Sequence, residues 1–185
     1  MKRILFCISV FLIFFSAGKD LSAAEGKSER NFWRYDFRSA RKYAKEEGKL
    51  LLLFFTISDS PVPMNKQMIL LYRTNRFFLE KSAEDYVLLH IDLPNDPEKL
   101  TAGRKRQNSL LRNRFSVTAF PAFVLADPGN PWGTLLYKRQ GRIAPGDLLD
   151  ILNKRFAARI KKMRQKRENE PSGNGKNGSE KGKIK

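Results

Sequence analysis

Three kinds of side chain in this sequence could do chemistry, but each stands without the partners that its chemistry needs. Met64 and Met68 lie four residues apart, a spacing that could present two soft thioethers to Cu(I), yet no histidine or cysteine is nearby in the sequence to complete a metal site. Ser60 has no identifiable His/Asp relay, which disfavours a hydrolase. The single histidine, His90, alternates with aliphatic residues, a pattern typical of a packed, hydrogen-bonded core residue. We therefore expect methionines that pack, no bound metal and no cofactor.

Two carboxylates stand at the ends of expected strands. Asp92 follows the apolar run VLLHI, and Asp127 follows AFVLA. No recognisable motif pairs a second carboxylate with either of them, so we interpret both as turn caps rather than as general acids or bases. The sequence also contains no glycine-rich phosphate loop.

Thiol chemistry is restricted by the cysteine count. The one cysteine, Cys7, lies in an apolar segment, residues 4–15, that follows two basic residues and precedes small ones. This arrangement is typical of a secretory signal peptide over residues 1–24, cleaved after Gly18 or Ala24, with an uncleaved membrane anchor as the alternative. Cleavage would leave an exported protein, periplasmic or secreted, without any cysteine, which excludes a disulfide framework.

Basic residues give the chain a formal net charge of +17, and they concentrate at its C-terminal end. Our default interpretation is a solvated surface that helps solubility. The functional alternative is an anionic partner, and for an exported protein an anionic membrane surface or envelope polymer is expected before nucleic acid. The candidate residues for that contact are Lys154, Arg155, Arg159, Lys161, Lys162, Arg164, Lys166 and Arg167.

The stretch Leu50–Met68 organises the elements that must position these residues. Its continuous apolar run predicts a strand at 50–56, covered on both faces of a sheet flanked by helices. Three N-cap residue types then precede Pro61, so we predict a helix from Pro61 to about residue 80. Residues 60–64 would lie on an exposed helix N-terminus at the end of a central strand.

The remaining elements follow from periodicity and turn residues. Apolar residues at helical spacing, beginning with Trp33, predict a helix over about 34–47. We also predict a buried parallel strand at 87–93, a basic helix over about 97–114, a hairpin of strands at 122–126 and 134–139, and a last helix from Pro145. The predicted organisation is a signal peptide at 1–24, a polar leader at 25–31, one domain at 32–158, and a basic helix extension with a disordered tail at 159–185.

Two segments resemble the thioredoxin-like superfamily. FTISDSPVPM, residues 55–64, resembles the FTxSDWCxxC segment of exported members, with Ser60 in place of the tryptophan and Pro61 and Met64 in place of the two cysteines. Residues 115–127 resemble the signature F-x-V-x-x-x-P-T-x-x-x-x-D. The resemblance implies an α/β, thioredoxin-like fold with a central mixed sheet of four to five strands flanked by helices. It also implies that the Phe120-Pro121 peptide bond is cis.

The same resemblance indicates which chemistry is absent. In the superfamily the first cysteine attacks as a thiolate, and the second resolves the mixed disulfide. Proline offers no nucleophile, and a methionine thioether cannot lose a proton. We therefore expect no thiol-disulfide oxidoreductase activity, and no catalytic residue at Pro61 or Met64.

The superfamily's substrate surface lets an extended peptide pair with the backbone just before the cis proline. The resemblance thus implies a protein-binding, peptide-binding or scaffold module. The residues that it assigns to this surface are Ser60, Pro61, Met64, Ala119, Phe120 and Pro121. Three alternatives stay open: a neutral relic with binding elsewhere, a basic envelope protein attached electrostatically, and an oxidoreductase by fold analogy alone.

Overall fold

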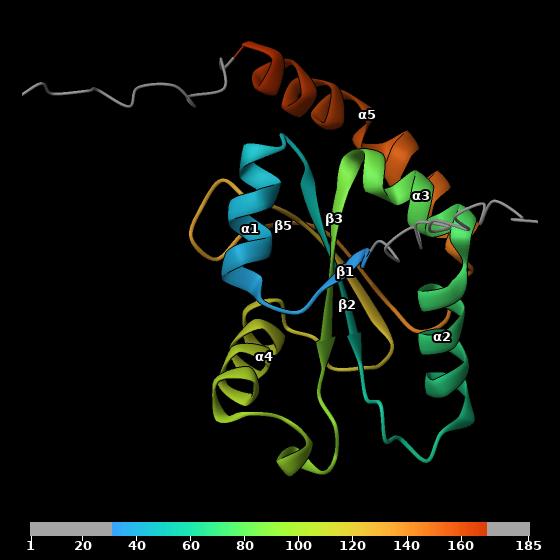
Figure 1. The fold of residues 1–185 in the computed structure, drawn as a ribbon. Coiled ribbons are helices and arrows are strands. Elements are labelled where there is room, and N and C mark those ends of the chain that lie inside the picture. The colour runs from blue at the N-terminus through green and yellow to red at the C-terminus, as the bar shows by residue number, and fades with distance from the viewer. Residues whose placement is uncertain (1–30, 170–185) are drawn as a thin grey trace, which may run out of the picture. The chain divides into compact units, whose positions relative to one another are not determined.

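The structure, a computed structural model, describes residues 31–169 (Figure 1). The predicted signal peptide at 1–24, the leader apart from its last residue, and the predicted disordered tail from residue 170 lie outside the described residues. No helix in the described range is long and apolar enough to cross a membrane.

A mixed sheet with the strand order β1-β3-β2-β4-β5 lies at the centre of the described chain. The strands are β1 (Trp33–Arg34), β2 (Leu50–Thr56), β3 (Tyr86–Asp92), β4 (Ala122–Asp127) and β5 (Thr134–Gln140). β3 runs parallel to both β1 and β2, whereas β4 runs antiparallel to both β2 and β5. The predicted α/β fold with a mixed central sheet is confirmed.

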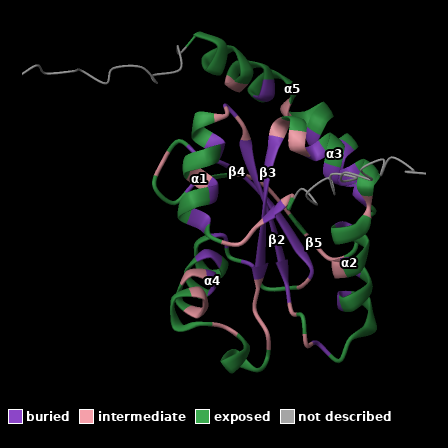
Figure 2. Cartoon of the chain, in the orientation of Figure 1, coloured by how far each residue is buried: buried purple, intermediate pink, exposed green. Residues whose placement is uncertain are grey.

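Helices cover both faces of this sheet (Figures 1 and 2). One face carries α1 (Phe37–Glu46) and α4 (Ala102–Arg114), and the other carries α2 (Pro63–Thr74), α3 (Arg76–Asp85) and α5 (Pro145–Asn169). Every residue of β2 is buried. Its side chains alternate between the two cores, with Phe54 packed on the α2 side and Phe55 on the α1 side. This double covering explains why β2 is a continuous apolar run rather than an alternating one.

The first helix begins later than predicted, and Trp33 is not part of it. Asp36 is the N-cap, because its carboxylate accepts the backbone N–H of Ser39 at 2.7 Å, so α1 starts at Phe37. Trp33 instead belongs to β1, with its ring buried against Phe54. Its helical spacing from the residues of α1 is therefore coincidental.

The helix predicted from Pro61 to about residue 80 is two helices, and the first starts two residues later. Val62 is the N-cap of α2, and Pro63 rather than Pro61 occupies the first turn, where no N–H is needed. Asn75 then ends α2 and caps α3, since its side-chain oxygen accepts the N–H of Phe78 at 2.8 Å. An internal asparagine cap of this kind interrupts a helix that its apolar periodicity would continue.

The last two helices also refine the prediction. The basic helix predicted over 97–114 is divided into a 3-10 turn, η1 (Pro97–Lys99), and α4, which is capped by Thr101. α5 begins at Pro145, as predicted, and continues without a break to Asn169. Ile160 is 8% exposed and joins the core. The core therefore extends into the basic segment beyond residue 158.

Candidate functional site

Both segments that resemble the superfamily leave the same end of the sheet. Phe55 of β2 pairs with Ala122 of β4 in antiparallel register, so the chain after β2 and the chain before β4 meet at one end. The Phe120-Pro121 peptide bond is cis. We call residues 57–64 together with residues 115–121 the Pro121 edge.

Ser60 holds the loop of the Pro121 edge in place. It is 5% exposed, and its hydroxyl oxygen accepts the Asn65 side-chain N–H₂ at 2.8 Å and the Val62 backbone N–H at 3.2 Å. Pro61 and Met64 are exposed beside it. The Ser60 hydroxyl is therefore used in local hydrogen bonds. This arrangement differs from that of a serine nucleophile, which a histidine activates.

Asp59 connects this loop to the one that follows β3. Its carboxylate accepts the backbone N–H groups of Asn95 and Asp96 at 2.7 and 3.0 Å and pairs with Lys99 at 3.0 Å. The N–H groups of Asp96 and Asn95 stabilise the charged carboxylate and hold the pKa of Asp59 at about 2. Asp59 is thus an organiser of the loops rather than the helix cap that its position before Pro61 suggested.

His90 is the packed, hydrogen-bonded core residue that the sequence predicted. Its Nε2 lies 2.8 Å from the Thr56 hydroxyl, which in turn donates to the Asp92 carboxylate at 3.0 Å. Burial lowers the pKa of His90 to about 4, although the Asp92 charge raises it and Arg73 adds to the lowering. The imidazole is therefore neutral at pH 7. Asp92 also accepts the N–H of Ser58 at 2.9 Å, so its carboxylate holds the loop that follows β2, whereas we predicted that it would cap the turn after its own strand.

The segment before Pro121 is held by one side chain that sequence reasoning missed. Gln140, at the end of β5, accepts the backbone N–H groups of Thr118 and Ala119 on one oxygen at 2.8 and 2.9 Å. The next N–H along the chain, that of Phe120, donates to no atom of residues 31–169. The only signal for Gln140 is its register opposite Ala122, which exists once β4 and β5 are paired.

A groove with a volume of about 490 Å³ adjoins this backbone. Phe120 forms part of its wall, together with apolar residues from the loops that follow β2 and β3, Ile57, Leu93 and Leu100. The Arg112 guanidinium lies 5.9 Å from the Phe120 ring centroid. The Pro121 edge thus combines a backbone donor without a partner with a groove beside it.

Of the two methionines that we expected to pack, Met68 does so and Met64 does not. Met68 is 2% exposed within the core under the sheet, and Met64 is 37% exposed. Within residues 31–169 no cluster of three or more His, Cys, Asp or Glu side chains could hold a metal ion.

The basic residues of α5 divide into two sets. Arg159, Lys162, Lys166 and Arg167 line a pocket with Lys45 of α1. The others are used elsewhere or point to solvent: Arg164 pairs with Asp85, Arg155 lies over the Tyr137 ring, and Lys154 and Lys161 are exposed. The sequence did not indicate that Lys45 joins this set, because it lies far from the residues of α5 along the chain.

Comparisons with known proteins find matches in structure alone. No protein-family model and no curated protein matches the sequence. Among solved structures, the oxidoreductase DsbH superposes with a TM-score of 0.55 at 18% identity, over 70% of this chain and 85% of that one. A thioredoxin from Thermus thermophilus superposes with a TM-score of 0.50 at 16% identity, over 66% of this chain and 84% of that one.

Proposed function

From the premise that the chain has a thioredoxin-like fold, we propose that it is an exported binding module, without thiol-disulfide exchange, that holds an extended segment of a partner protein along the Pro121 edge. The observation that carries this proposal is the backbone N–H of Phe120, which has no acceptor among the described residues while both preceding N–H groups are held by Gln140. An extended peptide can supply that acceptor, as in strand addition.

The surroundings of Phe120 support the same proposal. A backbone contact alone carries little selectivity, and side-chain pockets beside it provide the rest. The groove next to Phe120 is lined by six apolar residues and by five polar or charged ones, among them Arg112. A partner segment that places an apolar side chain in this groove would bury surface on both molecules.

The absence of thiol exchange rests on composition. The chain has one cysteine, and a dithiol cycle within one chain needs two. Pro61 and Met64 occupy the positions that the resemblance assigns to the redox pair. Insulin reduction by the protein at the rate of a thioredoxin would contradict this part of the proposal and favour the oxidoreductase alternative.

Export is supported by the sequence of residues 1–24, with two basic residues, an apolar segment and small residues at the expected cleavage position. N-terminal sequencing of the protein recovered from the cell envelope or culture medium tests it. A new N-terminus at residue 19 or 25 is expected, and an intact N-terminus in the cytoplasm would contradict it.

Peptide binding is tested by selection from a displayed random-peptide library, followed by amide hydrogen exchange with the selected peptide. The Phe120 amide should exchange quickly in the free protein and become protected in the complex. The amides of Thr118 and Ala119 are internal controls, because Gln140 already protects them. Protection that appears elsewhere and leaves Phe120 unchanged would favour a relic surface.

A matched pair of variants separates the Pro121 edge from the rest of α2. Met64→Glu places a charge on the edge, whereas Leu70→Glu places the same charge on an exposed residue further along the same helix. We expect the first to weaken peptide affinity by about tenfold or more and the second to change it less than about twofold. Equal effects would indicate that the peptide binds somewhere other than the edge.

A further inference from the structure

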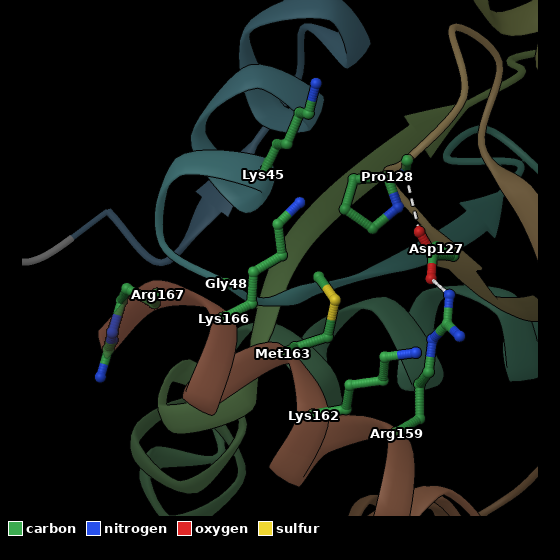
Figure 3. Close-up of a pocket in the computed structure, with 10 residues that line it drawn as sticks. Lys45, Gly48, Asp127, Pro128, Arg159, Lys162, Met163, Lys166 and Arg167 are labelled. Atoms are coloured by element: carbon green, nitrogen blue, oxygen red, sulfur yellow. Dashed lines mark hydrogen bonds and ion pairs between the residues drawn. The ribbon is translucent and has the colours of Figure 1, made fainter. Parts of the chain in front are cut away.

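A second recess lies at the opposite end of the sheet, where β2 begins and β4 ends. It has a volume of about 250 Å³ and is formed by the end of α1, the turn after β4 and the last turns of α5 (Figure 3). Five of the side chains that line it are basic: Lys45, Arg159, Lys162, Lys166 and Arg167. We call this recess the basic pocket.

Gly48 allows α5 to come close enough to form the basic pocket. Its φ is +59°, and a Cβ at this position would lie 2.5 Å from the Met163 carbonyl oxygen and 3.0 Å from the Arg167 Cβ. Any other residue would be strained and would push α5 away. The carbonyl groups at the end of α1 are meanwhile satisfied within the turn, since Ala44 accepts the N–H of Lys49 at 2.8 Å.

The one carboxylate among the described residues that line the basic pocket is already neutralised. Asp127 has an 8% exposed side chain, accepts the N–H of Gly129 at 2.8 Å and forms an ion pair with Arg159. Asp127 therefore fixes the Arg159 guanidinium without cancelling the rest of the charge. Figure 3 shows the Asp127–Arg159 pair on one wall, with the Lys162 side chain directed toward it and Arg167 directed away.

Three of the cations around the basic pocket have no counter-ion among the described residues. Lys45, Lys162 and Arg167 form no ion pair with any residue in the range 31–169. Lys162 and Lys166 are one helical turn apart, so both reach the same recess. The charges of Lys45, Lys162 and Arg167, which are not paired within this range, favour an anion in this region.

We propose that the basic pocket binds a compact phosphoryl anion that carries at least two negative charges. A single carboxylate would leave most of the charge uncompensated, whereas a phosphate group accepts hydrogen bonds from several donors at once. Lysine ammonium groups serve as point-charge donors to phosphate, and an arginine held in place by a carboxylate keeps free N–H groups to add to them. The site lies at the other end of the sheet from the Pro121 edge, so it does not depend on the proposed peptide binding.

Inorganic pyrophosphate is the probe, titrated into the protein by isothermal calorimetry at low ionic strength. Lys162→Ala is compared with Lys161→Ala, which removes the same charge from the adjacent residue, outside the lining of the pocket. We expect Lys162→Ala to bind pyrophosphate about tenfold more weakly, because it loses one charge-assisted hydrogen bond. The affinity of Lys161→Ala should stay within about twofold of that of the parent protein. Affinity should also fall as salt increases.

Two results would overturn the proposal. One is the absence of saturable pyrophosphate binding to the parent protein. The other is an equal loss in both variants, which would indicate diffuse attraction to the whole basic helix. Circular dichroism of both variants confirms that α5 persists, because the two lysines are exposed and their replacement by alanine favours a helix.

Vesicles distinguish the two sources of such a phosphoryl group. Phosphatidic acid presents a phosphate monoester, whereas phosphatidylglycerol at the same surface charge presents a diester. If the protein prefers phosphatidic acid vesicles, and if Lys162→Ala weakens this preference while Lys161→Ala does not, the ligand is a lipid headgroup. If the protein binds pyrophosphate but does not prefer phosphatidic acid, the ligand is a free phosphoryl compound. Both results support a phosphoryl-binding site in the basic pocket.

Discussion

The two ends of the sheet are built from different interactions. At the Pro121 edge, the side-chain oxygens of Gln140, Asp59 and Ser60 accept hydrogen bonds that hold the loops around a backbone donor and a groove. At the basic pocket, exposed cations gather around the Asp127–Arg159 ion pair, in which Asp127 is buried and Arg159 is half exposed. Gly48 allows α5 to approach this recess. The sheet positions both sets of segments, but the first end depends on hydrogen bonding and the second on charge. Conditions that weaken one end should therefore leave the other largely unchanged.

The largest effect that we expect is that of acid, which acts through His90 at the end of the sheet that carries the Pro121 edge. His90 is buried neutral with a pKa of about 4, so the unfolded state binds more protons between about pH 6.5 and pH 4. The free energy of unfolding should fall as pH decreases through this window, by up to about 3 kcal/mol. Urea unfolding at a series of pH values measures it.

The control is the same series with His90→Gln, which keeps a polar side chain beside Thr56 but cannot titrate. Its stability should be nearly flat between pH 6.5 and about pH 5, because the pKa values of Asp59 and Glu98 are lowered in the fold and carboxylates of the unfolded chain are still largely ionised there. If the parent and variant lost stability in parallel, the titrating group would not be His90.

Breaking the Asp127–Arg159 ion pair should have the next largest effect. Asp127→Asn keeps the size of the side chain but leaves Arg159 without its counter-ion. We expect a cost of about 1.5 kcal/mol in the free energy of unfolding, because Asp127 is buried but Arg159 is 45% exposed and can be solvated. The loss should become smaller at high salt, because the Arg159 side chain is 45% exposed and salt screens its charge. Urea unfolding in low and high salt measures both effects. Amide exchange at Ala119 should remain unchanged, and faster exchange there would show that the two ends are coupled.

The smallest expected effect is that of Gln140→Ala. It removes the acceptor of two backbone N–H groups at an exposed site, which should cost about 1 kcal/mol. Amide exchange at Thr118 and Ala119 should accelerate, while pyrophosphate affinity stays the same. A change in pyrophosphate affinity would contradict the independence of the two ends.

Local sequence patterns predicted most of the fold because the strands are defined by short-range signals. The apolar run of β2, the alternation around His90 and the turn residues after Asp127 all lie within a few positions of the element they specify. The predicted start of α2 was wrong because Pro61 and Pro63 both suit the first turn of a helix, and the sequence pattern does not distinguish between them.

The functional features that were missed depend on long-range pairing. Gln140 reaches Ala119 only after β4 and β5 adopt their register, and Lys45 meets α5 only after the whole sheet is assembled. The resemblance to the thioredoxin-like superfamily supplied Ala119 to Pro121 as candidate residues. It supplied nothing at the other end, because α5 continues past the segment that the resemblance covers.

Gly48 has a consequence for how this architecture can be inherited. The closeness of its backbone to Met163 ties the α1–β2 junction to a helix encoded more than one hundred positions later. A descendant that gained a side chain at the junction would have to shorten or relocate its final helix, and one that lost the helix would be released from the glycine. Natural variation at these two distant places in the gene should therefore be correlated.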